Sequence, residues 1–183
     1  MTMDNPNLIW IDCEMTGLDV EKDALIEIAV LVTDSQLNIL GEGVDLVIKT
    51  NQAKLDAMSE FVTKMHTDSG LIKEVANGVS LEQAQKQVMT YLNRYAPDPG
   101  KSPLAGNSVN FDRSFIQKYL PEVAAHLHYR TIDVSSIKEL ARRWYPKVYF
   151  AAPKKDGNHR ALGDIQDSIE ELEYYRTNIF IPN

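Results

Sequence analysis

Two acidic residues, separated by one position, end an apolar segment near the N-terminus. Asp12 and Glu14 lie in the stretch IWIDCEMTGLD. Residues i and i+2 of a strand share a face, so both carboxylates should point the same way at the end of a strand, where open α/β sheets bind ligands. Carboxylates held close together repel each other unless a cation joins them, and oxygen ligands favour Mg²⁺ or Mn²⁺. The pair therefore indicates a divalent-cation site, with a strand end that frays into solvent as the alternative.

Three more candidate residues occur much later in the chain. Asp112 begins a predicted helix in GNSVNFDRSF, after a segment of small residues. His159 and Asp164 stand in NHRALGD, at the start of the last predicted helix. Taken singly, an Asp near a helix N-terminus is typical of a cap or a dipole partner, and a lone His is usually a surface or core residue.

These residues must be positioned by a set of strands followed by helices. Apolar runs predict strands over 8–13, 24–34 and 39–49, and their short connections predict an antiparallel meander. Helical spacing follows, and Ser80 and Gln83 occupy capping-box positions. The expected elements after the meander are helices over 53–66, 70–77, 80–95, 111–119, 135–145 and 160–176, strands over 103–106 and 129–134, and a loop over 146–158. This order predicts an α/β fold with a mixed central sheet flanked by helices, in one domain over 1–183.

Length and composition are those of an ordinary globular enzyme or binding protein. The 183 residues suit one domain, and the contents of 44% hydrophobic and 25% charged residues are typical. The single cysteine, Cys13, cannot form an internal disulfide and fits a reducing cytoplasm. We see no signal-peptide pattern and no run of the roughly 20 apolar residues that a membrane helix needs. A cytoplasmic protein without a membrane span is expected.

The charge is negative overall but uneven. The formal net charge of −7 argues against a long nucleic-acid partner, because such binding rests on many contacts between cations and phosphates. Residues 138–160 nevertheless hold seven Lys or Arg against two acids. This stretch is either a solvated helix face with a polar loop or a small local anion site.

The ordered set of acids and histidine resembles the DEDDh family of 3′→5′ exonucleases. The set is Asp12-x-Glu14, then Asp112, then His159-x₄-Asp164. The blocks IWIDCEMTGLD, HTDSGL, GNSVNFDRSF, HYRTIDVSSIKELARRWYP and NHRALGDIQDSIEELEYYR carry the resemblance over nearly the whole chain. They are closest to the branch of the family that degrades short oligoribonucleotides, which often has Trp at the position of Phe61 and an acid at that of Gly163.

The resemblance implies a ribonuclease-H-like fold and a phosphodiester hydrolase that uses two divalent cations, Mg²⁺ or Mn²⁺. It implies that Asp12 bridges both cations, that Glu14 and Asp164 complete the site on the nucleophile side, and that Asp112 helps to hold the other cation. His159 would be the general base. The expected substrates are short RNAs, especially dinucleotides, which would be hydrolysed to 5′-mononucleotides.

The resemblance also assigns residues that hold the substrate. Leu18 and Phe61 would wedge or stack the bases, although core packing is the alternative for both. Tyr129 would reach in from a second subunit, which implies a homodimer, and His66 would support the site. Three residues would hold a 5′ phosphate, Ser108, Arg130 and Ser135, although Ser135 could instead cap the helix that follows it.

Three other functions remain open at this point. One is a DEDDh exonuclease for longer substrates, such as DNA proofreading or tRNA trimming. Another is a binding module that holds RNA or protein without cleaving it, which the complete five-residue set disfavours. The last is a two-carboxylate glycosidase using Asp12 and Glu14, which leaves Asp112 and Asp164 unexplained.

Overall fold

The fold is built on one mixed sheet. In the computed structural model, which describes residues 5–153 and 159–180, five strands pair in the order β3-β2-β1-β4-β5. β2 is antiparallel to both β1 and β3, while β4 is parallel to both β1 and β5. The predicted antiparallel meander and mixed sheet are thus confirmed. The strands are β1 (Leu8–Met15), β2 (Leu25–Thr33), β3 (Val44–Val47), β4 (Leu104–Gly106) and β5 (Thr131–Asp133).

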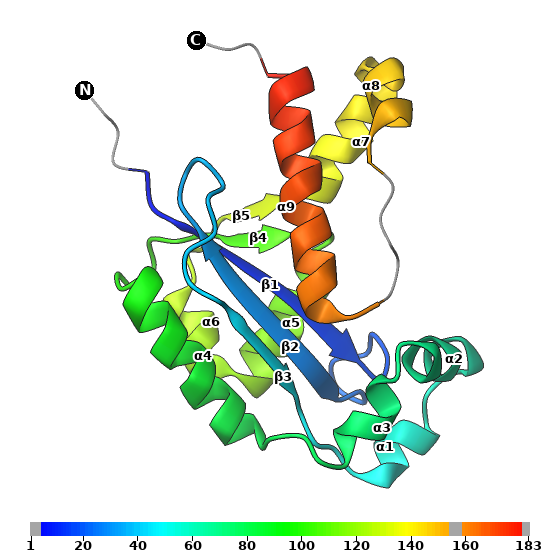
Figure 1. Cartoon of the computed structure of the whole chain (residues 1–183). Coiled ribbons are helices and arrows are strands. Elements are labelled where there is room, and N and C mark those ends of the chain that lie inside the picture. Colours follow the sequence, from blue (N-terminus) through cyan, green and yellow to red (C-terminus); the bar gives the residue numbers. More distant parts are fainter. Residues whose placement is uncertain (1–4, 154–158, 181–183) are drawn as a thin grey trace.

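Helices cover both faces of the sheet (Figure 1). Every residue of β2 is buried, as expected for a central strand covered on both sides. Along β1, Ile9 and Ile11 pack into the core on one face, while Trp10 packs into the core on the other. The first face is covered by α4 (Leu81–Tyr95), α5 (Asn110–Tyr119) and α6 (Pro121–His126), and the second by α7 (Val134–Trp144) and α9 (Ala161–Asn178).

Three short helices gather where β1 ends and β2 begins (Figure 1). They are α1 (Gln52–Asp56), α2 (Glu60–Asp68) and α3 (Leu71–Val75). Leu71 and Val75 pack on Ile26 in a small core of their own. This group therefore forms a wall beside the end of the sheet where the acids of β1 lie.

Two predicted elements were wrong in extent. The helix expected over 53–66 is two helices, α1 and α2, because Ser59 begins a new helix by accepting the N–H of Val62 at 3.3 Å. The strand expected over 39–49 is only four residues long, because Gly41 and Gly43 have φ values of 75° and 81° and interrupt the extended chain. The capping box of Ser80 and Gln83 is confirmed at the start of α4.

Two helices were not predicted, and proline begins each of them. Pro121 starts α6, and Pro146 starts α8 (Pro146–Ala151) where a loop was expected. Proline suits the first helical position because its missing N–H would have no partner there. Pro146 thus ends α7 and begins the next helix. No helix in the ranges that the structure describes is long and apolar enough to cross a membrane.

Candidate active site

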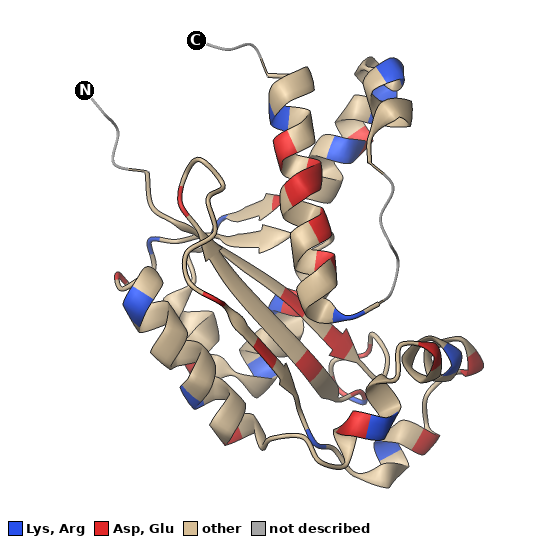
Figure 2. Cartoon of the chain, in the orientation of Figure 1, with Lys and Arg blue, Asp and Glu red and all other residues tan. Residues whose placement is uncertain are grey.

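Three carboxylates converge at the end of β1. Asp12 and Glu14 share the face of Trp10, which looks toward α9, and Asp164 lies in the first turn of that helix. One oxygen from each of the three acids lies within 4.8 Å of the others. Figure 2 shows acidic residues gathered where β1 and β2 meet the start of α9. The structure therefore brings together residues that are about 150 positions apart in the sequence.

Asp112 adjoins this group from the other side of β1. It is buried in the first turn of α5, and its Oδ1 accepts the backbone N–H of Cys13 at 3.0 Å. That N–H is available because β4 pairs with β1 only up to Trp10 and ends at Gly106. Asp112 is outside the group of three acids whose oxygens lie within 4.8 Å of one another. After burial, however, its charge makes the largest contribution to raising the pKa of Asp12.

Burial and mutual repulsion make these acids reluctant to ionise. Burial raises the pKa of Asp12 well above its ordinary value, and the charges of Asp112, Glu14 and Asp164 raise it further. Burial also raises the pKa of Glu14 to about 8 and that of Asp112 to about 7. Burial of carboxylates that repel one another is therefore the main electrostatic feature of the site.

The donor set fits a hard divalent cation. The converging atoms are carboxylate oxygens, the ligands that Mg²⁺ and Mn²⁺ prefer. The two neighbouring residues that could alter this preference do not join the group: Cys13 points into the opposite core, and His66 lies behind Glu14. A cation at this point would remove the repulsion that raises the pKa values.

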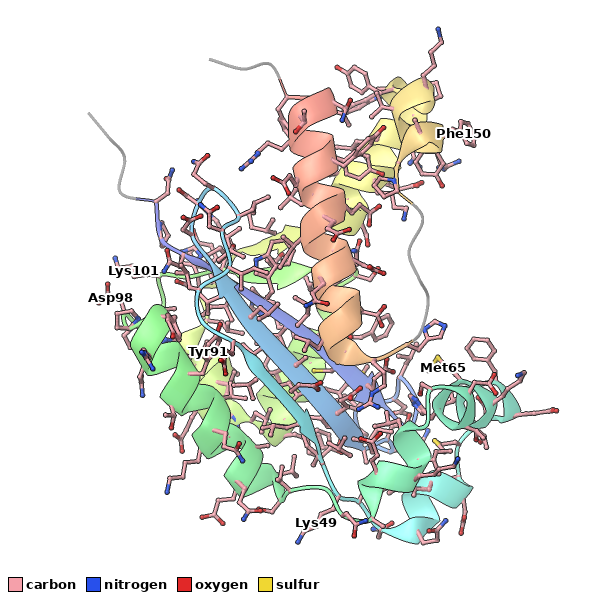
Figure 3. All side chains as sticks on the ribbon, viewed as in Figure 1. Lys49, Met65, Tyr91, Asp98, Lys101 and Phe150 are labelled. Carbon is pink, nitrogen blue, oxygen red and sulfur yellow. The ribbon has the colours of Figure 1, made fainter. Side chains whose placement is uncertain are left out.

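His159 borders a hollow between α2 and the segment before α9. It is exposed and has a φ of 49°, an unusual backbone conformation for a residue other than glycine. The hollow, of about 560 Å³, is lined by α2 and by the segment before α9, including Phe61, Met65, His159 and Arg160. Figure 3 shows Met65 on the side of α2 that faces the start of α9. His159 is also near enough to His66 to contribute to lowering the pKa of that buried ring, after burial itself.

His66 supports Glu14 from inside the protein. Its ring is fully buried, and Nε2 lies 2.9 Å from the carbonyl oxygen of Met15. A carbonyl only accepts, so Nε2 carries the proton and donates it. Nδ1 then faces Oε2 of Glu14 at 3.9 Å. The support role expected for His66 stays a prediction.

The two predicted base contacts are on the surface. Leu18 is 61% exposed in the loop after β1, and Phe61 is 77% exposed on α2, so core packing is excluded for both. Asp23 fixes the loop that carries Leu18, because its carboxylate accepts the N–H of Asp19 at 2.9 Å and the hydroxyl of Thr16 at 3.3 Å.

Two of the three predicted phosphate contacts come together. The hydroxyl oxygens of Ser108 and Ser135 are 3.1 Å apart, and Ser135 donates its hydroxyl to Asn107 Oδ1 at 2.9 Å. Ser108 has a φ of 56°, and its N–H donates to Asp133, which also caps α7. The cap of α7 is therefore Asp133, which excludes the alternative role of Ser135 as the cap.

Tyr129 and Arg130 precede β5, whereas Ser135 follows it. The guanidinium carbon of Arg130 lies 5.3 Å from the centre of the Tyr129 ring, and both side chains are exposed. One three-residue strand thus separates Arg130 from the serine pair. Tyr129 is 72% exposed, so its ring is accessible to a second molecule.

Sequence reasoning missed several residues that organise the site. Glu27 is fully buried on β2, directly opposite Glu14, and is held by Arg160. A charged residue in the middle of the apolar run ALIEIAVLVT was the signal that could have revealed it. Asn107 joins Ser135 to Ser168 on α9, with its Nδ2 2.7 Å from Ser168 Oγ, and carried no signal beyond its place in the GNS segment.

Comparisons with known proteins agree with this arrangement. The family model RNase_T, described as an exonuclease, matches residues 9–172. The chain is 57% identical to an oligoribonuclease of Streptomyces griseus over 178 residues, which cover 97% of this chain and 89% of that protein. It is 54% identical to an oligoribonuclease of Leifsonia xyli over 181 residues, covering 99% of this chain and 87% of the relative.

Solved structures show the same fold at low identity. The zinc-bound form of E. coli ExoI in complex with ssDNA superposes with a TM-score of 0.72 at 14% identity, over 96% of this chain and 41% of that one. A moderately thermophilic Exonuclease I from Methylocaldum szegediense gives a TM-score of 0.71 at 18% identity, over 95% of this chain and 41% of that one. The ribonuclease-H-like fold predicted from the resemblance is therefore confirmed.

Proposed function

Because the chain belongs to the RNase_T exonuclease family, we propose that it is a 3′→5′ exoribonuclease that hydrolyses short oligoribonucleotides to 5′-mononucleotides. The observation that carries the proposal is the convergence of Asp12, Glu14 and Asp164 within 4.8 Å at the end of β1. The proposal covers the whole chain, 1–183, as one catalytic domain in the cytoplasm.

The acids would hold divalent cations, Mg²⁺ or Mn²⁺. Two such cations supply the positive charge that stabilises the attacking and leaving oxygens of an in-line phosphodiester displacement. Asp12 would be the central ligand of this set, because the charges of Asp112 on one side and of Glu14 and Asp164 on the other all raise its pKa. Four ionised carboxylates carry the charge that two divalent cations neutralise.

His159 would accept the proton of the attacking water on a ring nitrogen. Its exposure at the rim of the hollow leaves the imidazole accessible to a substrate phosphate and to solvent. Imidazole is the side chain most often used as a general base. A base that is not itself a cation ligand would separate proton transfer from cation binding.

Phe61 and Leu18 would contact the bases at the 3′ end, and the serine pair would contact a 5′ phosphate. Both apolar side chains are exposed to water, where they bury no surface of their own. Contact with the bases would bury them, which supports a role in stacking. Ser108 and Ser135 lie at the C-terminal ends of β4 and β5, on the same edge of the sheet as Asp112. Arg130 would add a planar cation suited to phosphate. If both contacts form, the substrate would be held at both ends, which would favour dinucleotides over long RNA.

A homodimer is part of the proposal. Exposed aromatic side chains cluster on α7 and α8, including Trp144 at 67% and Phe150 at 81% exposure. Figure 3 shows Phe150 pointing away from the body of the protein. Such rings are costly to leave in water, so burial against a second copy supports this arrangement. Tyr129 would then reach the site of the partner.

Product analysis on 5′-phosphorylated RNAs of two to ten nucleotides tests the function. We expect release of mononucleotides from the 3′ end, the highest kcat/KM for the dinucleotide, and no cleavage in EDTA. Equal kcat/KM for a dinucleotide and a 20-nucleotide RNA, at matched salt, would favour the alternative of a longer-substrate exonuclease. Cleavage that persists in EDTA would contradict the cation-dependent mechanism.

A further inference from the structure

Arg160, the residue after His159, joins three parts of the protein. Its Nε lies 2.8 Å from Oε1 of Glu27 on β2, and its Nη2 lies 2.7 Å from the same oxygen. Its Nη1 and Nη2 lie 2.9 and 3.2 Å from the two oxygens of Glu74 on α3. The guanidinium thus ties the start of α9 to the sheet and to the helical wall beside the site.

Glu27 also caps α9 from outside the helix. Arg160 is the N-cap residue of α9 and makes no side-chain cap, whereas Oε2 of Glu27 accepts the N–H of Ala161 at 3.2 Å. A carboxylate at this position satisfies a backbone donor that has no partner within the helix and interacts favourably with the helix dipole. Glu27 therefore fixes the beginning of the helix that carries Asp164.

Stability alone does not explain a charged bridge at this point. Glu27 is fully buried, and apolar residues of similar volume often replace a buried ion pair without loss of stability. The guanidinium instead provides geometric specificity, because its planar fork fixes the relative orientation of the groups that it binds. The bridge is thus suited to setting the geometry of the segment next to it.

The residue immediately before Arg160 is His159, which has a left-handed backbone conformation. On the other side of the hollow, α3 packs against α2, the helix that carries Phe61. We propose that Arg160 is a positioning residue: its bridge to Glu27 and Glu74 orients His159 beside the acids and fixes the distance between His159 and the wall that carries Phe61. The inference rests on the proposed function, because it takes His159 to be the base.

Arg160→Lys tests the fork, because it keeps the positive charge and loses the planar geometry. We expect kcat to fall by about 10–100-fold, since a misplacement of about 1 Å costs up to about 10²-fold in rate. KM for the dinucleotide should rise as well, because the two-pronged contact to Glu74 is lost with the fork. Backbone amides of residues 161–164 should exchange with solvent faster than in the unmodified protein. In Arg160→Ala, millimolar methylguanidinium should restore part of the lost kcat. Glu74→Gln, which loosens only the contact to α3, should raise KM for the dinucleotide.

Arg176→Lys is the matched control. Arg176 lies near the far end of α9, where it donates to the carbonyl of Gln36 at 3.0 Å and pairs with Glu173 at 3.7 Å. Its replacement should leave kcat, KM and exchange at 161–164 unchanged.

Wild-type kcat and wild-type exchange in Arg160→Lys would overturn the proposal, as would a loss of stability with unchanged kcat per folded molecule. If Arg160→Ala does not fold, unchanged kinetics in both Arg160→Lys and Glu74→Gln would also overturn it. Failure of the proposed function would look different, because the unmodified protein would then cleave no short RNA, while the exchange measurement needs no activity.

Discussion

Replacing Glu14 with Gln should stabilise the cation-free protein at alkaline pH while it abolishes catalysis. Burial, and then the charges of Asp164, Glu27 and Asp112, raise the pKa of Glu14 from 4.5 to about 8. The folded protein therefore keeps this proton to a higher pH than the unfolded chain does. Below pH 4.5 both states are protonated, and Glu14 has no effect on stability. As the pH rises from 4.5 to 8 the unfolded state loses the proton first, so the stability of the folded state falls.

The magnitude follows from the size of the pKa change. One pKa unit corresponds to about 1.4 kcal/mol, so ionised Glu14 destabilises the cation-free fold by at most roughly 5 kcal/mol above pH 8. Relaxation of the other carboxylates and entry of water reduce this value, and we expect about 1–3 kcal/mol. The Gln side chain finds a partner as well, because its amide can donate to Nδ1 of His66, the buried nitrogen that faces Oε2 of Glu14 at 3.9 Å.

Urea unfolding at pH 5, 7 and 9 in EDTA measures the effect. The difference in free energy of unfolding between Glu14→Gln and the unmodified protein should be at most roughly 0.8 kcal/mol at pH 5, where the unfolded chain has begun to ionise, and should grow to about 1–3 kcal/mol in favour of the variant at pH 9. Excess Mn²⁺ should reverse the order, because it binds the unmodified site more tightly. Glu170→Gln, which removes an exposed carboxylate from α9, is the control and should show no such pH dependence. A pH-independent difference, or a variant less stable at pH 9 in EDTA, would refute the electrostatic reasoning.

Three further predictions concern the reaction and the assembly. His159→Ala should retain Mn²⁺ binding by calorimetry but lose about 10²–10⁴-fold in kcat, the usual contribution of a general base; a wild-type rate across pH 6–9 would give His159 a structural role instead. Phe61→Ala should raise KM for the dinucleotide by about 5–30-fold at nearly constant kcat, from roughly 1–2 kcal/mol of lost stacking, whereas a fall in kcat alone would argue against a base contact. Trp144→Glu should convert the proposed dimer to monomer in sedimentation and reduce kcat/KM, and a fully active monomer of the unmodified protein would disprove the contribution of Tyr129 across the interface.

The sequence predicted those parts of the fold that local chemistry determines. The apolar run over β2 and the alternation along β1 follow from burial of the sheet on both faces, and the capping box at Ser80 follows from hydrogen bonds within one turn. The points at which a strand or a helix is interrupted were harder to predict. Gly41 and Gly43 interrupt a segment of strand-like composition, and Ser59 divides a segment of helical composition. At each of these points one residue with a specific backbone role outweighs the average propensity of its neighbours.

The site was predictable as far as its residues form an ordered motif. Asp12 and Glu14 share a face for reasons of strand geometry, but their meeting with Asp164 depends on where α9 packs, which no local pattern specifies. The serine pair was expected only through the resemblance, and its geometry depends on Asn107 and Asp133, two polar residues in short segments. Long-range hydrogen bonds of this kind leave little trace in periodicity or composition.

Glu14 and Glu27 illustrate why the roles of acids cannot be assigned from spacing alone. They face each other across β1 and β2, and both are buried. Both carboxylate oxygens of Glu27 accept hydrogen bonds, one from Arg160 and the other from the N–H of Ala161. The carboxylate of Glu14 instead lies close to two other carboxylates and to a nitrogen of His66. The protein therefore neutralises one member of the pair internally and leaves the charge of the other for a cation. This division limits the proposed ligands to four carboxylates, and it makes the arginine next to the proposed base part of the electrostatic balance of the site.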